Sequence, residues 1–123
     1  PMTNKKVWYN KEKFSAWGGA LTTASDLVFY GTLDRWFKAL DAKSGKTLWK
    51  FQVGSGVIGN AFTYANKGKQ HVGVLSGIGG WAGVAMNLGL TNPTDALGAA
   101  GGYAELTKYN AAPGGGALTV FSL

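Results

Sequence analysis

Two tryptophans that stand beside glycines are the residues of this chain whose types and spacing could build a ligand site. Trp17 precedes Gly18 and Gly19, and Trp81 follows Gly80 in the stretch GIGGWAG. An indole offers apolar surface and one N–H donor, and neighbouring glycines let the backbone approach a ligand closely or adopt positive φ. Both positions are candidate ligand contacts, although an aromatic packed between structural elements explains Trp17 equally well.

The other reactive residue types argue against metal or acid–base chemistry carried by this chain. His71 is the only histidine, falls in an expected strand and has no cysteine with which to share a metal. One imidazole cannot build a metal site. Asp26, Asp34 and Asp41 occupy expected turns or strand ends, where turn chemistry explains them. The glycines around Trp81 do not predict nucleotide binding, because that fingerprint requires a strand followed by a helix.

Composition indicates a folded β protein. The chain has 123 residues with 20 glycines, 13% aromatic residues and only 15% charged residues, which is typical of tight turns around large side chains. The net charge of +6 is spread along the chain and favours solvated turns over a nucleic-acid-binding stripe. No apolar run approaches the roughly 20 residues that span a bilayer. We therefore expect no nucleic-acid partner and no membrane span.

Short runs bounded by turn residues predict consecutive antiparallel strands from Gly19 onward. Four such runs in about 35 residues match the size of one propeller blade. A second cycle begins and is interrupted by a stretch at about 79–113 that lacks strand alternation, where a long loop and a short helix are expected. The expected division is a leading segment at 1–18, a complete four-stranded blade at 19–56 and an incomplete last blade at 57–123.

One repeat signature stands out in the first expected blade. The residues Ala39, Asp41, Gly45 and Trp49 resemble the tryptophan-docking motif of the eight-bladed quinoprotein dehydrogenases, whose tryptophan packs between neighbouring blades. The resemblance covers nearly the whole chain, which is similar to the C-terminal fifth of the large subunit of methanol dehydrogenases that use pyrroloquinoline quinone (PQQ). The stretch VLSGIGGWAG is closer to the lanthanide-dependent branch of that family than to the calcium branch.

This resemblance implies an all-β fold, formed by the C-terminal blades of an eight-bladed β-propeller. It also implies site residues. Trp17 would reach the edge of the quinone, Gly80 and Trp81 would lie over the cofactor, and Trp81 with Leu88 would wall a cavity for a very small alcohol. A packed loop leucine explains Leu88 equally well. The docking-motif residues would be structural, and no catalytic residue or metal ligand would fall in this chain.

The implied activity is oxidation of methanol and other small primary alcohols to the aldehyde, with PQQ as acceptor and a lanthanide or Ca²⁺ as Lewis acid. The metal ligands would lie outside this chain, so the chain alone would be inactive. The implied partners are the remainder of the large subunit and a c-type cytochrome that accepts electrons. The resemblance further implies a periplasmic location and a homodimer of the full enzyme.

The sequence leaves two alternative functions open. A non-enzymatic propeller scaffold would share the spacing from Ala39 to Trp49 but has no need for Gly80 and Trp81 in a long loop. A quinoprotein for larger alcohols would need a smaller residue at Trp81 or Leu88. The three-stranded second blade also leads us to expect that the chain is one piece of a closed ring and is not stable alone. A cooperative melt of the isolated chain would contradict that expectation.

Overall fold

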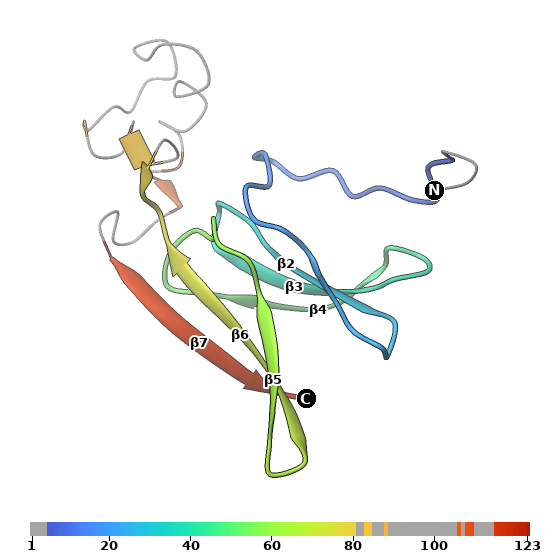
Figure 1. Ribbon diagram of the computed structural model, residues 1–123. Coiled ribbons are helices and arrows are strands. Elements are labelled where there is room, and N and C mark those ends of the chain that lie inside the picture. Colours follow the sequence, from blue (N-terminus) through green and yellow to red (C-terminus); the bar gives the residue numbers. More distant parts are fainter. Residues whose placement is uncertain (1–4, 81–82, 85–87, 89–105, 107, 110–114) are drawn as a thin grey trace.

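The chain forms seven β-strands in two antiparallel sheets (Figure 1). The computed structural model describes residues 5–80, 83–84, 88, 106, 108–109 and 115–123. The first sheet has the strand order β1-β2-β3-β4, and the second has the order β5-β6-β7. The strands are β1 (Leu21–Thr22), β2 (Leu27–Gly31), β3 (Trp36–Asp41), β4 (Thr47–Gln52), β5 (Phe62–Asn66), β6 (Lys69–Gly77) and β7 (Gly116–Ser122).

The strand prediction is confirmed in type and in order. Each expected run contains one observed strand, and β7 pairs with β6 along its whole length although the interrupting stretch separates them in sequence. The helix expected within 79–113 falls largely outside the described residues. The four-stranded and three-stranded sheets match the count expected for the two blades, while the domain boundaries themselves stay a prediction.

Turn chemistry sets the connections within both sheets. After β3, the Asp41 carboxylate accepts hydrogen bonds from the Ser44 amide and the Ser44 hydroxyl, both at 2.7 Å. The hydroxyl is the larger cause that lowers the pKa of the Asp41 carboxyl below its ordinary value. Gly45 completes this turn with a φ of +72°. Between β5 and β6, Lys67 and Gly68 have φ of +50° and +76°, as in a two-residue type I′ hairpin.

The hydrophobic core lies between the two sheets. Phe37 of β3 is fully buried, and its ring stacks at 5.9 Å on Phe29 of β2 and at 5.7 Å on Phe121 of β7. The buried cluster consists of Phe29, Phe37, Ala39, Val53, Val57, Val72 and Val74. Since β2, β3 and β6 all contribute to it, each sheet buries its apolar face chiefly against the other.

Trp49 of β4 also reaches from the first sheet to the second. Its ring stacks on Phe51 at 6.1 Å and meets Phe121 of β7 edge to face at 4.9 Å. In the register of β3 and β4 it lies opposite Ala39. Both Trp49 and Phe51 are exposed in part, as is the whole of β4.

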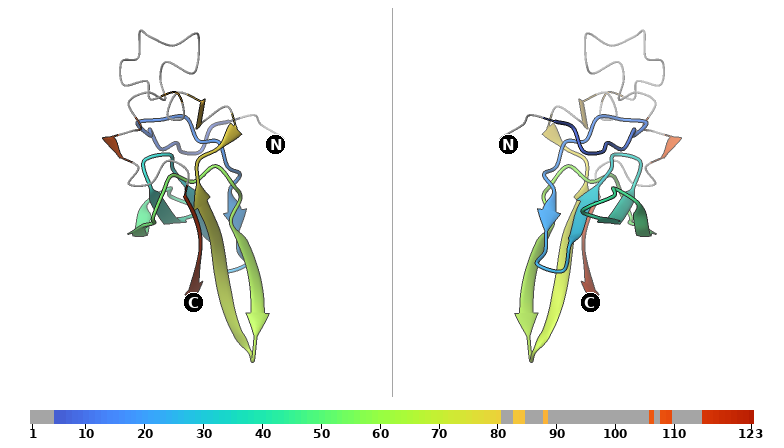
Figure 2. Two further views of the ribbon diagram at one scale, coloured as in Figure 1. Left: turned by 90° about the vertical axis from the view of Figure 1, so that its left-hand side faces the viewer. Right: turned by 90° about the vertical axis from the view of Figure 1, so that its right-hand side faces the viewer.

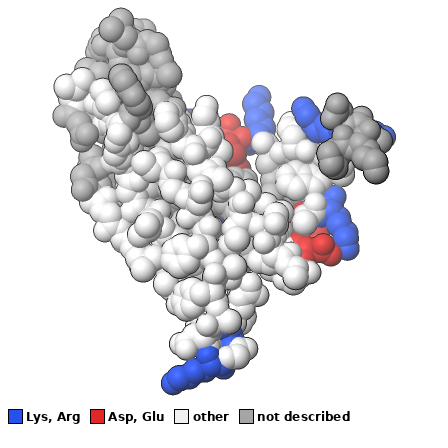
Figure 3. All heavy atoms as spheres, viewed as in Figure 1, with Lys and Arg blue, Asp and Glu red and all other residues white. Residues whose placement is uncertain are grey.

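Charged side chains avoid the broad face over the second sheet. On the side shown in Figure 3, blue and red atoms gather at the margins of the molecule, and the surface between them is uncharged. One such margin is the turn of the β5–β6 hairpin, which carries Lys67 and Lys69 and extends past the other strands (Figure 2). This distribution agrees with the solvated turns expected from the charge spacing.

Candidate functional site

The leading segment is held against the first sheet by alternate side chains. The Trp8 indole N–H donates to the Ala42 carbonyl at 2.9 Å, and the Asn10 amide donates to the Gly45 carbonyl at 3.2 Å. The Trp8 ring covers Gly45 so closely that a Cβ there would lie 2.6 Å from it. Phe14 makes a further ring contact, with Tyr109. Side chains two residues apart point the same way in an extended chain, which accounts for the alternation.

Trp8 is a docking residue that the sequence reasoning missed. It covers the glycine of the docking motif, whereas Trp49 of the same motif contacts β7. A signal was present, because Lys5-Lys6-Val7-Trp8 repeats the spacing of Lys46-Thr47-Leu48-Trp49.

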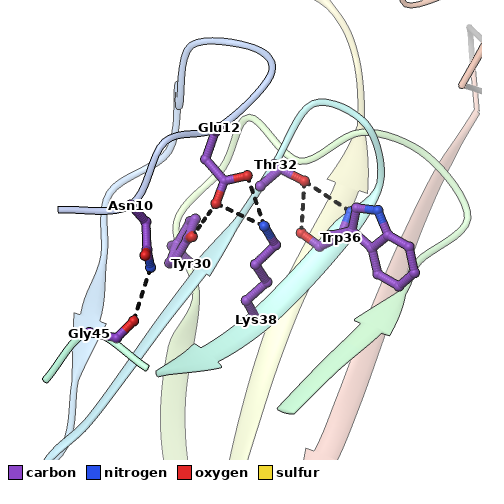
Figure 4. Close-up of polar contacts among 7 residues, drawn as sticks. All are labelled: Asn10, Glu12, Tyr30, Thr32, Trp36, Lys38 and Gly45. Carbon is purple, nitrogen blue, oxygen red and sulfur yellow. Dashed lines mark hydrogen bonds and ion pairs between the residues drawn. The ribbon is translucent and has the colours of Figure 1, made fainter. Parts of the chain in front are cut away.

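Glu12 of the leading segment bonds to two strands of the first sheet (Figure 4). Both of its carboxylate oxygens accept from the Lys38 ammonium at 2.8 Å, and one also accepts from the Tyr30 hydroxyl. The side chains of Lys38 and Glu12 are only 16% and 19% exposed. Burial, reinforced by the Glu12 carboxylate, raises the pKa of the Tyr30 hydroxyl far above its ordinary value. Tyr30 therefore stays a neutral donor that fixes the carboxylate.

Replacing Glu12 by glutamine will destabilise the full-length protein by about 1–3 kcal/mol, because the largely buried Lys38 ammonium loses its counter-charge. The measurement is the urea midpoint of unfolding, with the Asp26→Asn variant as matched control. Asp26 also pairs with a lysine, Lys43, at 2.7 Å, but these two side chains are 56% and 78% exposed. Exposed pairs contribute little, so equal losses in the two variants would contradict the role assigned to Glu12.

Trp17 is followed by two residues whose backbone is fixed, Gly18 and Gly19. Its side chain is 44% exposed. The backbone of Gly18 packs so tightly on the Gly59 carbonyl that no Cβ would fit. The Gly19 amide then donates to the Asn60 side-chain carbonyl at 2.5 Å. The indole is thus partly open to solvent, on a backbone that is tied to the loop between the two sheets.

The second group of predicted site residues follows β6. Gly80 has a φ of +53° and nothing lies within 4 Å of the place where its Cβ would stand. The turn continues with the Gly83 amide, which donates to the Gly79 carbonyl at 3.1 Å. Leu88 is 69% exposed. Trp81 lies outside the described residues, so its direction relative to Trp17 stays a prediction.

The described parts of these two groups, residues 17–19 and the end of β6 that leads to Gly80, lie at the same end of the sheets. The turn that leads from the leading segment into β1 and the end of β6 are at this end in Figures 1 and 2. The Gly77 amide at the end of β6 donates to the Gly56 carbonyl at 2.7 Å, in the loop that also holds Asn60. This loop between β4 and β5 therefore supports both groups.

The described residues contain no group of three His, Cys, Asp or Glu side chains that could hold a metal ion. His71 instead stacks on Tyr64 with ring centroids 5.1 Å apart. Within the same residues, no helix has the length and apolar character needed to cross a membrane. What the site offers chemically is a partly exposed indole and an open glycine backbone.

Comparison with known proteins decides the family. The pattern of the PQQ glucose, ethanol and alcohol dehydrogenase β-propeller domain matches residues 2–72. Over 122 residues the chain is 60% identical to the lanthanide-dependent methanol dehydrogenase of Methylorubrum extorquens. The aligned region covers 99% of this chain and 20% of that protein. The chain belongs to the PQQ-dependent alcohol dehydrogenases.

Other members of this dehydrogenase family match over the same extent. The chain is 48% identical to subunit 1 of the methanol dehydrogenase [cytochrome c] of Methylobacterium organophilum, with 99% of this chain and 19% of that subunit covered. The solved structure of a europium-containing methanol dehydrogenase superimposes with a TM-score of 0.86 at 47% identity, over 99% of this chain and 22% of that chain. The β-propeller fold is thereby confirmed. The chain spans about a fifth of the length of the curated relatives it matches.

The described residues suit one part of a PQQ site in such a dehydrogenase. The partly exposed Trp17 indole has an apolar face and an N–H donor of the kind that a flat ring can contact, and the open space at Gly80 would permit close approach of a planar group. The same residues supply no set of metal ligands. These residues would therefore fit one wall of a cofactor site.

Proposed function

We propose that this chain is part of a PQQ-dependent methanol dehydrogenase and supplies walls of its cofactor and substrate pocket. The observation that carries the proposal is the match of nearly the whole chain to methanol dehydrogenases, in sequence and in structure. The partly exposed indole of Trp17, whose following residues Gly18 and Gly19 are fixed to the Gly59–Asn60 loop, supports the assignment of this residue to a cofactor wall.

Each proposed residue has a limited physical task. Trp17 orients the quinone by lying against its edge, and Gly80 lets the backbone pass close to the ring. Trp81 and Leu88 restrict the cavity to a very small alcohol and exclude water from it. When bound, PQQ supplies the two-electron oxidant for the alcohol. The exposure of the Leu88 side chain leaves its surface open to such a cavity.

The remaining assignments concern the whole protein. A lanthanide, or Ca²⁺, is held by ligands beyond the described residues of this chain, and it acts as a Lewis acid. The electron acceptor is a c-type cytochrome, which the name of the relative from Methylobacterium organophilum supports. The enzyme is a periplasmic homodimer, in which the remainder of the large subunit completes the ring of blades.

Dye reduction by the full-length protein tests this function. The purified protein is given PQQ with lanthanum or with calcium, and its turnover of methanol, ethanol and longer primary alcohols is compared. We expect turnover that requires PQQ, is highest with lanthanum and favours methanol. A preference for longer alcohols would contradict the small cavity at Trp81 and Leu88. No turnover with any alcohol would favour a propeller scaffold.

A further inference from the structure

We propose that Tyr109 is a positioning residue that holds Trp17 in place, and thereby sets how tightly the protein binds PQQ. The inference rests on the proposed function in one respect, namely that Trp17 contacts the quinone. Tyr109 belongs to the connection between β6 and β7, the same connection that carries Gly80, Trp81 and Leu88. The Tyr109 side chain contacts two residues of the leading segment, Lys13 and Phe14.

Tyr109 contacts the leading segment shortly before Trp17. Its ring meets the Phe14 ring edge to face, with centroids 5.7 Å apart and an interplanar angle of 71°. Its hydroxyl accepts a hydrogen bond from the Lys13 ammonium, which also lies 4.6 Å from the centre of the ring. Edge-to-face and cation–π contacts are both favourable arrangements for an aromatic ring.

Tyr109 is itself fixed to the first sheet and to a buried residue. The Arg35 guanidinium donates to the Tyr109 carbonyl at 3.3 Å and, through Nε, to the Val53 carbonyl at 3.0 Å. The Tyr109 amide donates to the carbonyl of Leu106, a fully buried residue, at 2.8 Å. Arg35 has a φ of +76°, a conformation that is unfavourable for a non-glycine residue and that its surroundings must hold.

These contacts leave Trp17 on a short span between two attachments. Tyr109 fixes the chain at Lys13 and Phe14, and the Gly59–Asn60 loop fixes it at Gly18 and Gly19. Only residues 15–17 lie between. With the first attachment removed, this span gains conformational freedom, and PQQ must then bind at the entropic cost of ordering it again.

Two variants of the full-length protein separate the contacts of Tyr109. Tyr109→Leu removes the ring from Phe14, whereas Tyr109→Phe keeps the ring and removes only the hydroxyl. Tyr64→Leu is the matched control. Tyr64 of β5 is a partly exposed tyrosine whose ring also stacks on two neighbouring rings, those of Phe62 and His71. Since an edge-to-face pair contributes about 0.5–1.5 kcal/mol, we expect Tyr109→Leu to weaken PQQ binding by about 2- to 10-fold. Tyr109→Phe retains most of the affinity.

A double-mutant cycle with Trp17→Ala tests whether Tyr109 acts through Trp17. PQQ affinity is measured by quinone titration of the wild type, both single variants and the double variant. We expect Tyr109→Leu to have little further effect once Trp17 is gone, because the two residues share one interaction with the quinone. A full, additive loss in the double variant would overturn the inference.

Hydrogen exchange of the protein without PQQ gives a readout that does not depend on the proposed function. We expect amides of residues 15–17 to exchange about 2- to 10-fold faster in Tyr109→Leu than in wild type or Tyr64→Leu. Unchanged exchange there would overturn the inference even if PQQ binds. Faster exchange in a protein that does not bind PQQ would refute the proposed function and leave the positioning of Trp17 by Tyr109 in force.

Discussion

Replacing Phe37 by alanine will destabilise the full-length protein by about 3–5 kcal/mol, the loss expected for a fully buried phenylalanine. Phe37 is 0% exposed, and its ring contacts Phe29 and Trp49 within its own sheet and Phe121 of the second sheet. Removing the ring opens a cavity where the two sheets meet, so both lose stability together. The measurement is the urea midpoint of unfolding together with amide exchange in β3 and β6.

Two further variants make the Phe37 result specific. Phe37→Leu keeps much of the volume and is expected to lose clearly less stability than Phe37→Ala. Val7→Ala removes methyl groups from a side chain that is 81% exposed and is expected to change little. If Phe37→Ala accelerates exchange in β3 but leaves β6 unchanged, the two sheets do not share one core.

Replacing Trp17 by alanine will weaken PQQ binding by about 10-fold or more, since burial of an indole surface against a flat ring contributes on the order of 1.4 kcal/mol or more. The Trp17 residue is partly exposed, and the backbone that follows it is held in place at Gly18 and Gly19. The measurement is the dissociation constant of PQQ for the full-length protein, at a saturating concentration of the metal.

The matched control for Trp17 is Tyr9→Ala in the same leading segment. Tyr9 is an aromatic residue with 73% exposure, and we expect its removal to leave PQQ affinity unchanged. Trp17→Phe, which retains a flat apolar ring, should recover part of the affinity. Equal affinity in wild type and Trp17→Ala would remove Trp17 from the cofactor wall, although the family assignment would stand.

The strands and turns were predictable because their signals are local. Alternating apolar runs marked the strands, and Asp41 with Gly45 marked a turn whose hydrogen bonds join residues three or four positions apart. The docking motif likewise pointed to Trp49, which the structure places against Phe121 of the neighbouring sheet. What the motif did not show was that a different tryptophan, Trp8, covers its glycine.

The sequence by itself determined the strands and the turns, because neighbouring residues encode turn geometry and backbone freedom. The resemblance to a known family, also read from the sequence, pointed to Trp17 and Gly80 as candidate site residues. Only the tertiary structure decided how Trp17 is held. The hydrogen bond from Lys38 to Glu12 joins positions 26 apart, and that from Lys13 to Tyr109 joins positions 96 apart. Such pairs leave no periodic signal in one sequence, since they join segments that are far apart along the chain.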